Sequence, residues 1–505
     1  MARNIEVPTT PIPKLLDTSL MLSASQISMV RDTISTAQAR ISHVDSEIAR
    51  LMDSVEDLQR RRSALLTYTQ NHTALIAPIR RLPPEILSDI FVQCRDVRWL
   101  DPVEYLLLPP RLDKTPLLLG TICSRWRSIS LSTPRLWASF SLNIRPKYLK
   151  AHVELAKIWF ARSGTCPLSI SLGCDVSVQH NMQRLMQVFL LHCERWYEVS
   201  LSLPLPVIRA LSPARHRLLK LQKLRMDLSA PHVIDIFEHA PQLRSFYLPS
   251  AFPLPMIKVP WEQLQYCHIG GFVGECLELL RLTPNLEECS VMPSWRFPQL
   301  DTHNPVQVSR LRTITIYGDP THILDKLVAP ELHKIFITLP DIPWVATAQL
   351  MSLLSRCSLR TLFFFSAGDK FHPSGNDLIQ FLRASPTLLE LHILGCASLA
   401  MNEWFLALFA YSKHSDTLHL VPMLHTMKVQ YTPKWFGILE FTNAVRSRMV
   451  SDTLKRVEIL CVRADGVSES FDSTTLSRLR QLQGDGLNVH VIDGEKEIIL
   501  TPCIS

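Results

Sequence analysis

The chain has 505 residues, of which 47% are hydrophobic and 20% are charged, and its formal net charge is +7. This balance is typical of a folded globular protein and excludes a largely disordered chain. Only 15 glycines stand against 35 prolines, so the sequence has little material for glycine-rich phosphate-binding loops. No apolar run approaches the roughly 20 residues that span a bilayer, and no membrane contact is predicted.

The cysteines and the N-terminus indicate the compartment. The 12 cysteines include no CxxC pair, and the first residues lack the apolar core of a secretory signal. We therefore expect free thiols in a reducing compartment, cytoplasmic or nuclear. The positive charge is spread along the chain without a basic tail, so nucleic-acid binding is not predicted.

The first predicted element is a long helix after a disordered N-terminus over residues 1–24. Apolar residues recur at alternating steps of three and four, which is a heptad pattern, at Ile27, Val30, Ile34, Ala37, Ile41, Val44, Ile48, Leu51, Val55 and Leu58. More than four such heptads predict a coiled-coil helix over residues 25–77, ending before Pro78. Two interpretations stay open: a homodimer through residues 27–58, or a helix that folds back on its own chain.

A new segment begins at "LPPEILSDIF", residues 82–91. Pro83 and Pro84 suit the first turn of a helix, where N–H groups have no intrahelical partner, and Glu85 complements the helix dipole. A second helix is predicted from "TPLLLGTICSRWRSIS", with Thr115 as N-cap and Pro116 at the first helical position. A turn and a strand-like segment, "STPRLWASFSL", follow.

Together these residues resemble the F-box motif, in particular the F-box-like proteins of mushroom-forming fungi. The resemblance rests on Leu82-Pro83-x-Glu85-Ile86-Leu87-x-x-Ile90-Phe91, Cys123-Ser124-Arg125-Trp126-Arg127 and Thr133-Pro134-x-Leu136-Trp137. It implies a small helical domain over residues 78–140 that docks on the Skp-type adaptor of a cullin–RING ubiquitin ligase. The adaptor-binding residues that it implies are Leu82, Pro83, Glu85, Ile86, Leu87, Ile90, Phe91, Cys123, Trp126 and Ile129. The link over residues 95–114 is longer than the family's usual one.

Beyond a connecting segment and cap over residues 141–195, a short apolar pattern recurs. It consists of an apolar residue, two others, an apolar residue, one other and a third apolar residue. Its instances start at Trp196, Leu221, Leu243, Leu264, Leu286, Leu311, Leu332, Leu359, Leu388, Leu424 and Leu454. Most intervals match the roughly 20 to 29 residues of leucine-rich repeats, each a strand plus a return helix. The sequence thus predicts an α/β solenoid, leucine-rich-repeat-like, over residues 196–505, with helical runs such as "HVIDIFEHA", "ECLELLRLT", "HILDKLVA" and "DLIQFLRAS".

Solenoids act mostly as binding surfaces, because their stacked parallel strands present one extended concave face. If the first, fourth and sixth positions of each repeat face the core, the third and fifth face outward. Aromatic and histidine side chains at outward positions are predicted to bind a target protein. These residues are Tyr247, Tyr266, His268, Phe336, Phe363 and His392. Glu288, Glu390 and Glu458 interrupt the outward lysines and arginines, which argues against a nucleic-acid stripe.

The sequence offers no catalytic signature. It contains no GxSxG elbow, no GxxxxGK[ST] loop, no HExxH pair and no zinc-spaced cluster, so neither a catalytic residue nor a metal or cofactor is predicted. "IGGFVGECLELL", residues 269–280, is not a GxGxxG motif, and a turn of the repeat explains its glycines.

Two functions stay open, and the resemblance to F-box proteins implies the first of them. The first is a non-catalytic substrate receptor of a Skp–cullin–F-box ubiquitin ligase, which docks on the adaptor through the F-box and holds an unknown target protein on the repeats. The alternative is a coiled-coil and solenoid scaffold that engages no ligase.

Overall fold

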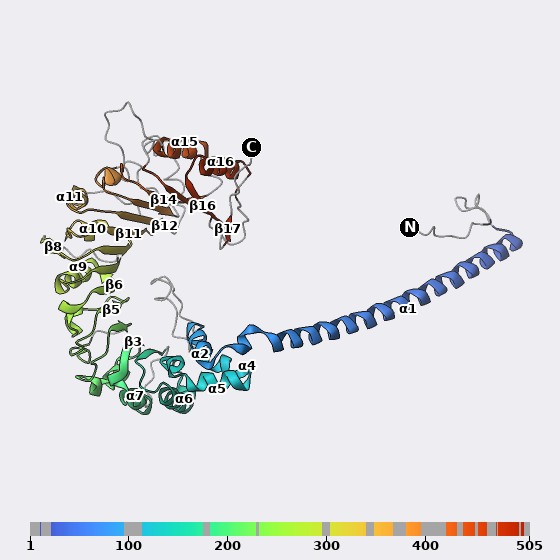
Figure 1. Cartoon of the computed structure of the whole chain (residues 1–505), viewed down its shortest axis with the longest axis horizontal. Coiled ribbons are helices and arrows are strands. Elements are labelled where there is room, and N and C mark those ends of the chain that lie inside the picture. The colour runs from blue at the N-terminus through green and yellow to red at the C-terminus, as the bar shows by residue number, and fades with distance from the viewer. Residues whose placement is uncertain are drawn as a thin grey trace. The chain divides into compact units, whose positions relative to one another are not determined.

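The structure is a computed structural model of the whole chain (Figure 1). It describes residues 11, 22–94, 114–174, 182–228, 232–294, 304–339, 348–366, 380–394, 421–431, 438–449, 453–461, 471, 473–493 and 496–498. The chain divides into two compact units, Met1–Leu87 and Ser88–Ser505.

The first unit is dominated by one helix, α1, Ala24–Ile76, of 53 residues. Ser23 caps its start: the Ser23 hydroxyl accepts the N–H of Gln26 at 3.4 Å, and the Gln26 side chain accepts the N–H of Ser23 at 2.9 Å. The helix ends where the sequence predicts, because Pro78 disfavours helical geometry at Ala77. A short 3-10 helix, η2, Pro78–Arg81, follows.

The F-box-like segment is helical, but its second half differs from the prediction. Helix α2, Pro84–Gln93, crosses the boundary between the units, and α4, Thr115–Ile122, α5, Ser124–Ser132, and the 3-10 helix η3, Pro134–Trp137, lie in the second. The single helix predicted from Thr115 is wrong, because the extended Cys123 separates α4 from α5 and its sulfur accepts the N–H of Trp126 at 3.4 Å. Lys114, not Thr115, precedes α4, and it provides no side-chain cap. The long link over residues 95–113 lies outside the described residues.

The second unit contains a sheet of 15 strands, among the described residues, whose spatial order follows their order in the chain. All neighbouring strands are parallel except the last pair, β16 and β17. The strands are β1 Ser139–Asn143, β2 Leu168–Gly173, β3 Trp196–Ser202, β4 Lys223–Met226, β5 Ser245–Leu248, β6 Tyr266–Phe272, β7 Glu288–Ser294, β9 Thr313–Tyr317, β11 Lys334–Leu339, β12 Thr361–Ser366, β13 Glu390–Leu394, β14 Thr426–Tyr431, β15 Arg456–Cys461, β16 Asn488–Asp493 and β17 Lys496–Ile498. A separate pair joins β8 Val306–Gln307 to β10 Leu327–Val328.

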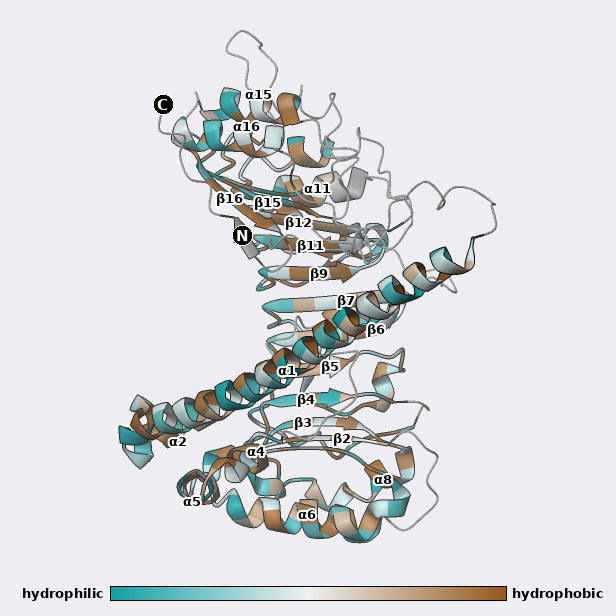
Figure 2. Ribbon diagram, turned by 90° about the vertical axis from the view of Figure 1, so that its right-hand side faces the viewer, coloured by the Kyte–Doolittle hydropathy of each residue, from teal (hydrophilic) through white to brown (hydrophobic). Residues whose placement is uncertain are grey.

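Helices alternate with these strands and lie on one face of the sheet (Figures 1 and 2). They are α6 Leu149–Arg162, α7 Gln183–Leu190, α9 Val273–Leu282, α10 Thr321–Leu324, α11 Ala348–Arg356, α15 Ile438–Met449 and α16 Ser473–Gly484. Shorter connecting helices are α8 Leu205–Arg209, η4 Pro146–Tyr148, η5 Cys193–Arg195, η6 Ser212–Ala214, η7 Leu254–Met256 and η8 Trp261–Gln263. The other face of the sheet is called the open face below. The predicted α/β arrangement of strands and return helices is thus confirmed.

The repeat residues predicted from the sequence form the core of this unit. Every predicted start, from Trp196 to Leu454, is at most 3% exposed. The fourth and sixth positions are buried too, as Phe246 and Leu248 are in β5. Because side chains alternate across a strand, the third and fifth positions lie on the open face.

The sheet is longer than predicted, and its return segments are less helical. β1 and β2 precede Trp196: β1 crosses the predicted boundary between the F-box-like domain and the connecting segment, and β2 lies inside the connecting segment. β16 and β17 follow the last predicted repeat. "ECLELLRLT" is helical as α9, but "HILDKLVA" holds only the short α10 and then β10, and "DLIQFLRAS" lies partly outside the described residues. "HVIDIFEHA" is not helical, because Ile234 bridges the next return segment: its N–H donates to the Met256 carbonyl at 2.7 Å.

The glycine stretch is not a turn. Gly270 and Gly271 belong to β6, and α9 starts two residues later, at Val273. The Glu275 carboxylate accepts the N–H of Phe272 at 3.0 Å and so caps the start of α9. A strand that runs directly into a helix explains this segment without a ligand.

Candidate protein-interaction surfaces

Helix α2 has an exposed apolar side and a buried one. Ile86 and Ile90, one turn apart, are 47% and 36% exposed, whereas Leu87 and Phe91 are 0% and 1% exposed. The sequence placed all four at the adaptor, but buried side chains cannot contact a partner in the folded chain. Leu87 and Phe91 are therefore corrected to core residues, and Ile86 and Ile90 remain available.

Helix α4 exposes apolar residues that the motif did not select. Leu118 and Ile122, four residues apart on one side of the helix, are 64% and 55% exposed, and Leu117 is 43% exposed, whereas Leu119 is buried. The run "PLLLG" could have indicated this exposure, because a helix cannot bury three successive leucines against one neighbour.

Packing and hydrogen bonds fix α4, α5 and η3 to one another. The Phe91 and Trp126 rings lie 4.7 Å apart between centroids. The Ser130 hydroxyl donates to the Pro116 carbonyl at 2.8 Å, and the Trp137 indole donates to the Ser130 carbonyl at 2.8 Å. Ile129, also predicted at the adaptor, is only 7% exposed and belongs to this core. Of the remaining predicted adaptor residues, Leu82 and Trp126 are half-buried and Pro83, Glu85 and Cys123 are exposed.

The open face of the sheet carries a continuous row of side chains in register, called the central row. Its members are Ser141, Ser171, Ser200, Arg225, Tyr247, His268, Ser290, Thr315, Phe336, Phe363, His392, Lys428, Glu458 and His490. Five of the six predicted target-binding residues fall in this row, and the sixth, Tyr266, lies in the next row beside Ser245 and Glu288. The parallel register therefore brings together residues that are far apart in the sequence.

The aromatic members form two groups. Ring centroids of Tyr247 and His268 are 6.5 Å apart, and those of His268 and Tyr317 are 6.0 Å apart. Further along the sheet, Phe336 lies 5.5 Å from Phe363, which lies 5.7 Å from His392. Such a surface suits burial against a protein partner, because rigid rings offer large contact area at low entropic cost.

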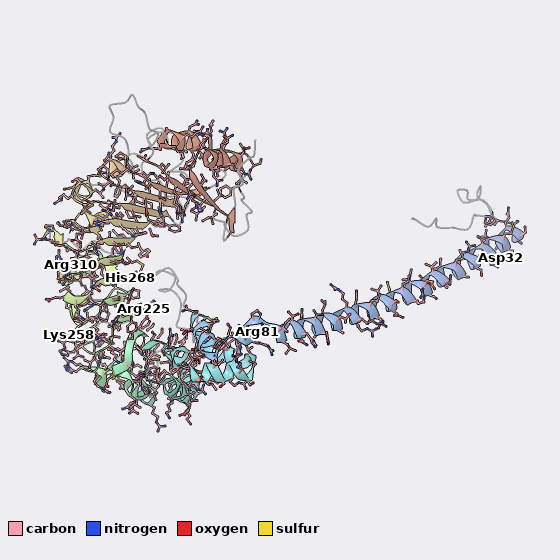
Figure 3. All side chains as sticks on the ribbon, in the orientation of Figure 1. Asp32, Arg81, Arg225, Lys258, His268 and Arg310 are labelled. Carbon is pink, nitrogen blue, oxygen red and sulfur yellow. The ribbon has the colours of Figure 1, made fainter. Side chains whose placement is uncertain are left out.

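The predicted target-binding residues differ in how exposed their side chains are. Tyr266 is 37% exposed, and Tyr247, Phe336, Phe363 and His392 are half-buried. His268 is only 2% exposed, so its prediction as a contact residue is corrected: it supports the surface from below. Burial, reinforced by the positive charge of Arg225, lowers the pKa of His268 to about 4. Figure 3 labels His268 and Arg225 on the open-face side of the sheet, and Lys258 and Arg310 on the other side.

The C-terminal end of the central row is charged, but its charges are paired. Lys428 lies 3.2 Å from Glu458, and Arg456 lies 2.6 Å from the same carboxylate. Although burial opposes ionisation of Glu458, the hydrogen bonds and charges of Lys428 and Arg456 lower its pKa overall. Mutual neutralisation leaves no uniform basic stripe at these strands.

The repeat pattern did not predict two aromatic residues of the open face. Tyr317 contacts His268, and Phe365 is 36% exposed. Each lies two residues beyond the fifth position of its repeat, where the pattern makes no prediction. The runs "TITIY" and "TLFFFS" could have indicated them, since alternation along a strand places every second residue on the same face.

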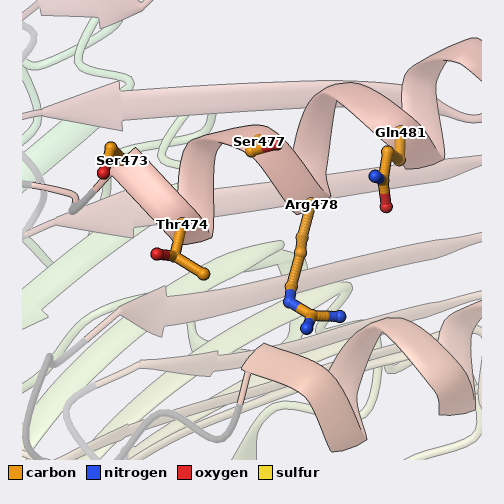
Figure 4. Close-up of a pocket in the computed structure, with 5 residues that line it drawn as sticks. All are labelled: Ser473, Thr474, Ser477, Arg478 and Gln481. Carbon is orange, nitrogen blue, oxygen red and sulfur yellow. The ribbon is translucent and has the colours of Figure 1, made fainter.

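The remaining features of the structure give little indication of function. The depression drawn in Figure 4 is lined by Ser473, Thr474, Ser477, Arg478 and Gln481, all from α16, so it is open surface on a single helix. Within the described parts of the chain, no three histidine, cysteine, aspartate or glutamate residues gather as metal ligands. None of the helices that the structure describes combines enough length and apolarity to cross a membrane.

Comparison of the sequence with models of known protein families gives no match, and comparison with curated proteins gives none either. Functional inference therefore rests on the residues and geometry described above.

Proposed function

We propose that the chain is the substrate-recognition subunit of a Skp–cullin–F-box ubiquitin ligase. Exposed apolar side chains of α2 and α4 dock on a Skp-type adaptor, which connects the chain to a cullin. The sheet is a leucine-rich-repeat-like solenoid, and its open face holds the target protein. The chain is not itself an enzyme, since the ligase chemistry belongs to the partner subunits.

The observation that carries the proposal is the uncovered apolar surface on α2, which bears the first part of the F-box-like motif, and on α4, which directly precedes the second part. Leu118, Ile122 and Ile90 are more than a third exposed, although leucine and isoleucine are normally buried. Leu118 and Ile122 lie one turn apart on α4, and exposed apolar patches mark protein-binding sites. An adaptor that covers them would remove this surface from water.

The sheet supports the second half of the proposal. Its strands follow chain order, are parallel over β1 to β16, and repeat at an interval typical of leucine-rich repeats. Stacked repeats of this kind bury a continuous core and leave one face for binding. The aromatic groups of the central row lie on that face.

Adaptor binding is tested by two matched double substitutions. Leu118→Asp with Ile122→Asp places two charges in the apolar surface of α4 and is expected to weaken binding to a fungal Skp-type adaptor by about 100-fold or more. The control, Ser124→Asp with Ser128→Asp, adds the same charges at the same spacing on exposed positions of α5 and should bind like the parent. Titration calorimetry measures both affinities.

An absence of binding by the parent chain would contradict the proposal and favour a scaffold that engages no ligase. Equal loss in both double variants would show that added charge, rather than the α4 surface, disturbs binding.

Target capture is tested on the open face. Phe336→Ala with Phe363→Ala removes the central aromatic pair and is expected to release proteins that co-purify with the parent chain, while adaptor binding is retained. Lys258→Ala with Arg310→Ala alters exposed side chains on the other side of the sheet and should change neither. Quantitative mass spectrometry of the co-purified proteins provides the measurement, and an unchanged set in the aromatic variant would place target binding elsewhere.

A further inference from the structure

Helix α1 presents an apolar seam that nothing in its own unit covers among the described residues. Eight of its seam residues are between 37% and 62% exposed, namely Ile27, Ile34, Ile41, Val44, Ile48, Leu51, Val55 and Leu58. The helix is continuous from Ala24 to Ile76, so the heptad spacing of the sequence becomes a real stripe along one side. Such a stripe stabilises a helix only when it is buried against another helix.

The composition of the seam indicates what covers it. The first position of each heptad is β-branched in five successive heptads, as Ile27, Ile34, Ile41, Ile48 and Val55. In a parallel two-stranded coiled coil these positions face their own copies, and β-branched side chains pack well there. In an antiparallel pair they would instead face the other seam position, which includes the small Ala37.

The flanking charges fit the same arrangement. In a parallel pair, the residue before each first seam position faces the residue five places later on the other helix. This rule brings Arg40 opposite Asp45, an attractive pair that occurs twice by symmetry. The other flanking pairs it creates over Ile27–Leu58, such as Gln26 with Arg31 and Glu47 with Met52, contain no like charges.

The seam also has a defined end. The first seam position after Leu58 is Arg62, and in a parallel pair two arginines would face each other. Like charges at that layer oppose pairing, so the contact should stop at Leu58.

We propose that a second copy of this chain covers the seam, forming a parallel, in-register, two-stranded coiled coil over Ile27–Leu58. The inference does not rest on the proposed ligase function. The coiled coil joins two complete chains at equivalent points, so every molecule carries two open faces. A target with two binding segments would then be held far more tightly than by one chain, because the second contact forms at high effective concentration.

The mass of the full-length protein tests the pairing. Light scattering coupled to size-exclusion chromatography should give twice the 57.6 kDa of one chain. Ile41→Asp with Ile48→Asp places four carboxylates in the paired seam and should give the mass of one chain. Ser42→Asp with Ala49→Asp adds the same charges one residue further round the helix and should keep the doubled mass.

Folding of the second unit can be followed separately. All 10 tryptophans lie at or after residue 99, so tryptophan fluorescence should be the same in the parent and in both variants. A parent protein with the mass of one chain at micromolar concentration would overturn the proposal, as would equal masses for the two variants.

The orientation is tested by single cysteines. Ile34→Cys and Ile48→Cys lie 14 residues apart, about 21 Å along the helix, and a parallel in-register pair brings each next to its own copy. Both should form disulfide-linked dimers on oxidation, above the background of the parent chain and of a Ser35→Cys control outside the seam. Linkage at only one position, or at neither, would rule out the parallel register.

Discussion

Replacing Gly270 by alanine is expected to destabilise the second unit by about 3 kcal/mol or more, although the change adds one methyl group. A Cβ atom at this position in β6 would lie 2.8 Å from the carbonyl carbon of Pro249, closer still to its oxygen, and 3.1 Å from the Met292 side chain. The nearest atoms belong to backbone, which cannot rotate away as a side chain can. Urea denaturation followed by tryptophan fluorescence measures the loss.

The matched control is Gly484→Ala at the end of α16. A methyl group at that position would meet no atom outside the local helix backbone within 4 Å, so the same chemical change should be neutral or slightly stabilising, by up to about 1 kcal/mol. Equal denaturation midpoints for the two variants would mean that Pro249 and β6 do not approach each other closely.

Acid is expected to weaken the second unit through His268. An exposed histidine has a pKa near 6.5, whereas burial among neighbouring rings, with the Arg225 charge nearby, lowers the pKa of His268 to about 4. Neither of its ring nitrogens has a hydrogen-bond partner within the described structure, so no acceptor favours the protonated form. The aromatic rings next to it belong to Tyr247 and Tyr317, whose phenol groups carry no negative charge at acid pH.

The direction of this effect follows from proton binding. Between pH 6.5 and pH 4 the unfolded chain binds a proton at residue 268 and the folded chain does not, so the free energy of unfolding falls as the pH falls. Above pH 6.5, His268 does not lower the free energy of unfolding. At pH 4, its unfavourable protonation in the folded chain lowers the free energy of unfolding by about 3 kcal/mol. Burial also lowers the pKa values of His152, His192 and His392, so a comparison of variants is needed to isolate one residue.

His268→Phe provides that comparison, because phenylalanine fills a similar space and does not titrate. The free energy of unfolding of this variant, relative to the parent, should rise as the pH falls from 6.5 to 4 and stay constant above 6.5. Chemical denaturation at several pH values measures both chains. Parallel profiles would show that His268 keeps its usual pKa.

The repeat pattern predicted the core of the sheet well, because burial alone decides which residues fill it. The pattern predicted that Trp196, Leu243 and Leu454 face the core, and all three are buried. Strand β16 was missed because its leucine, Leu487, is displaced by one residue: the position equivalent to Leu454 is Gly486, with a φ of 100°. A local change of one residue thus hides a repeat from a spacing rule.

The segment that contains β1 was predicted to be strand-like, but its place in the repeat pattern was missed, for a different reason. Trp137, Phe140 and Leu142 have the spacing of the repeat, and all three are buried, but Trp137 also completes the F-box-like motif. One tryptophan serves both: its ring packs in the core, and its indole donates to the Ser130 carbonyl at the end of α5. The sequence could not show that the motif and the sheet share a residue.

The sequence predicted which elements form the candidate surfaces, but not which of their residues are exposed. The register of parallel strands follows from the repeat, so the central row could be predicted from spacing. The spacing could not predict which residues of a helix or strand are buried, because burial depends on which side of that element the neighbouring elements cover. The residues affected are Leu87, Phe91, Ile129 and His268. Motif resemblance selects residues without separating those that bind a partner from those that build the fold.

The last strand of the sheet has a consequence for the behaviour of the protein at high concentration. β17 spans three residues and is antiparallel to β16, whereas the strands before it are parallel. An uncapped β16 would expose a row of backbone donors and acceptors, which is a template for a strand from another molecule and a start for fibril growth. β17 occupies the half of that template over Val491–Asp493 from within the same chain, and very short edge strands are poor templates themselves. The pairing of β17 therefore shortens the edge of β16 that a strand from another molecule could use.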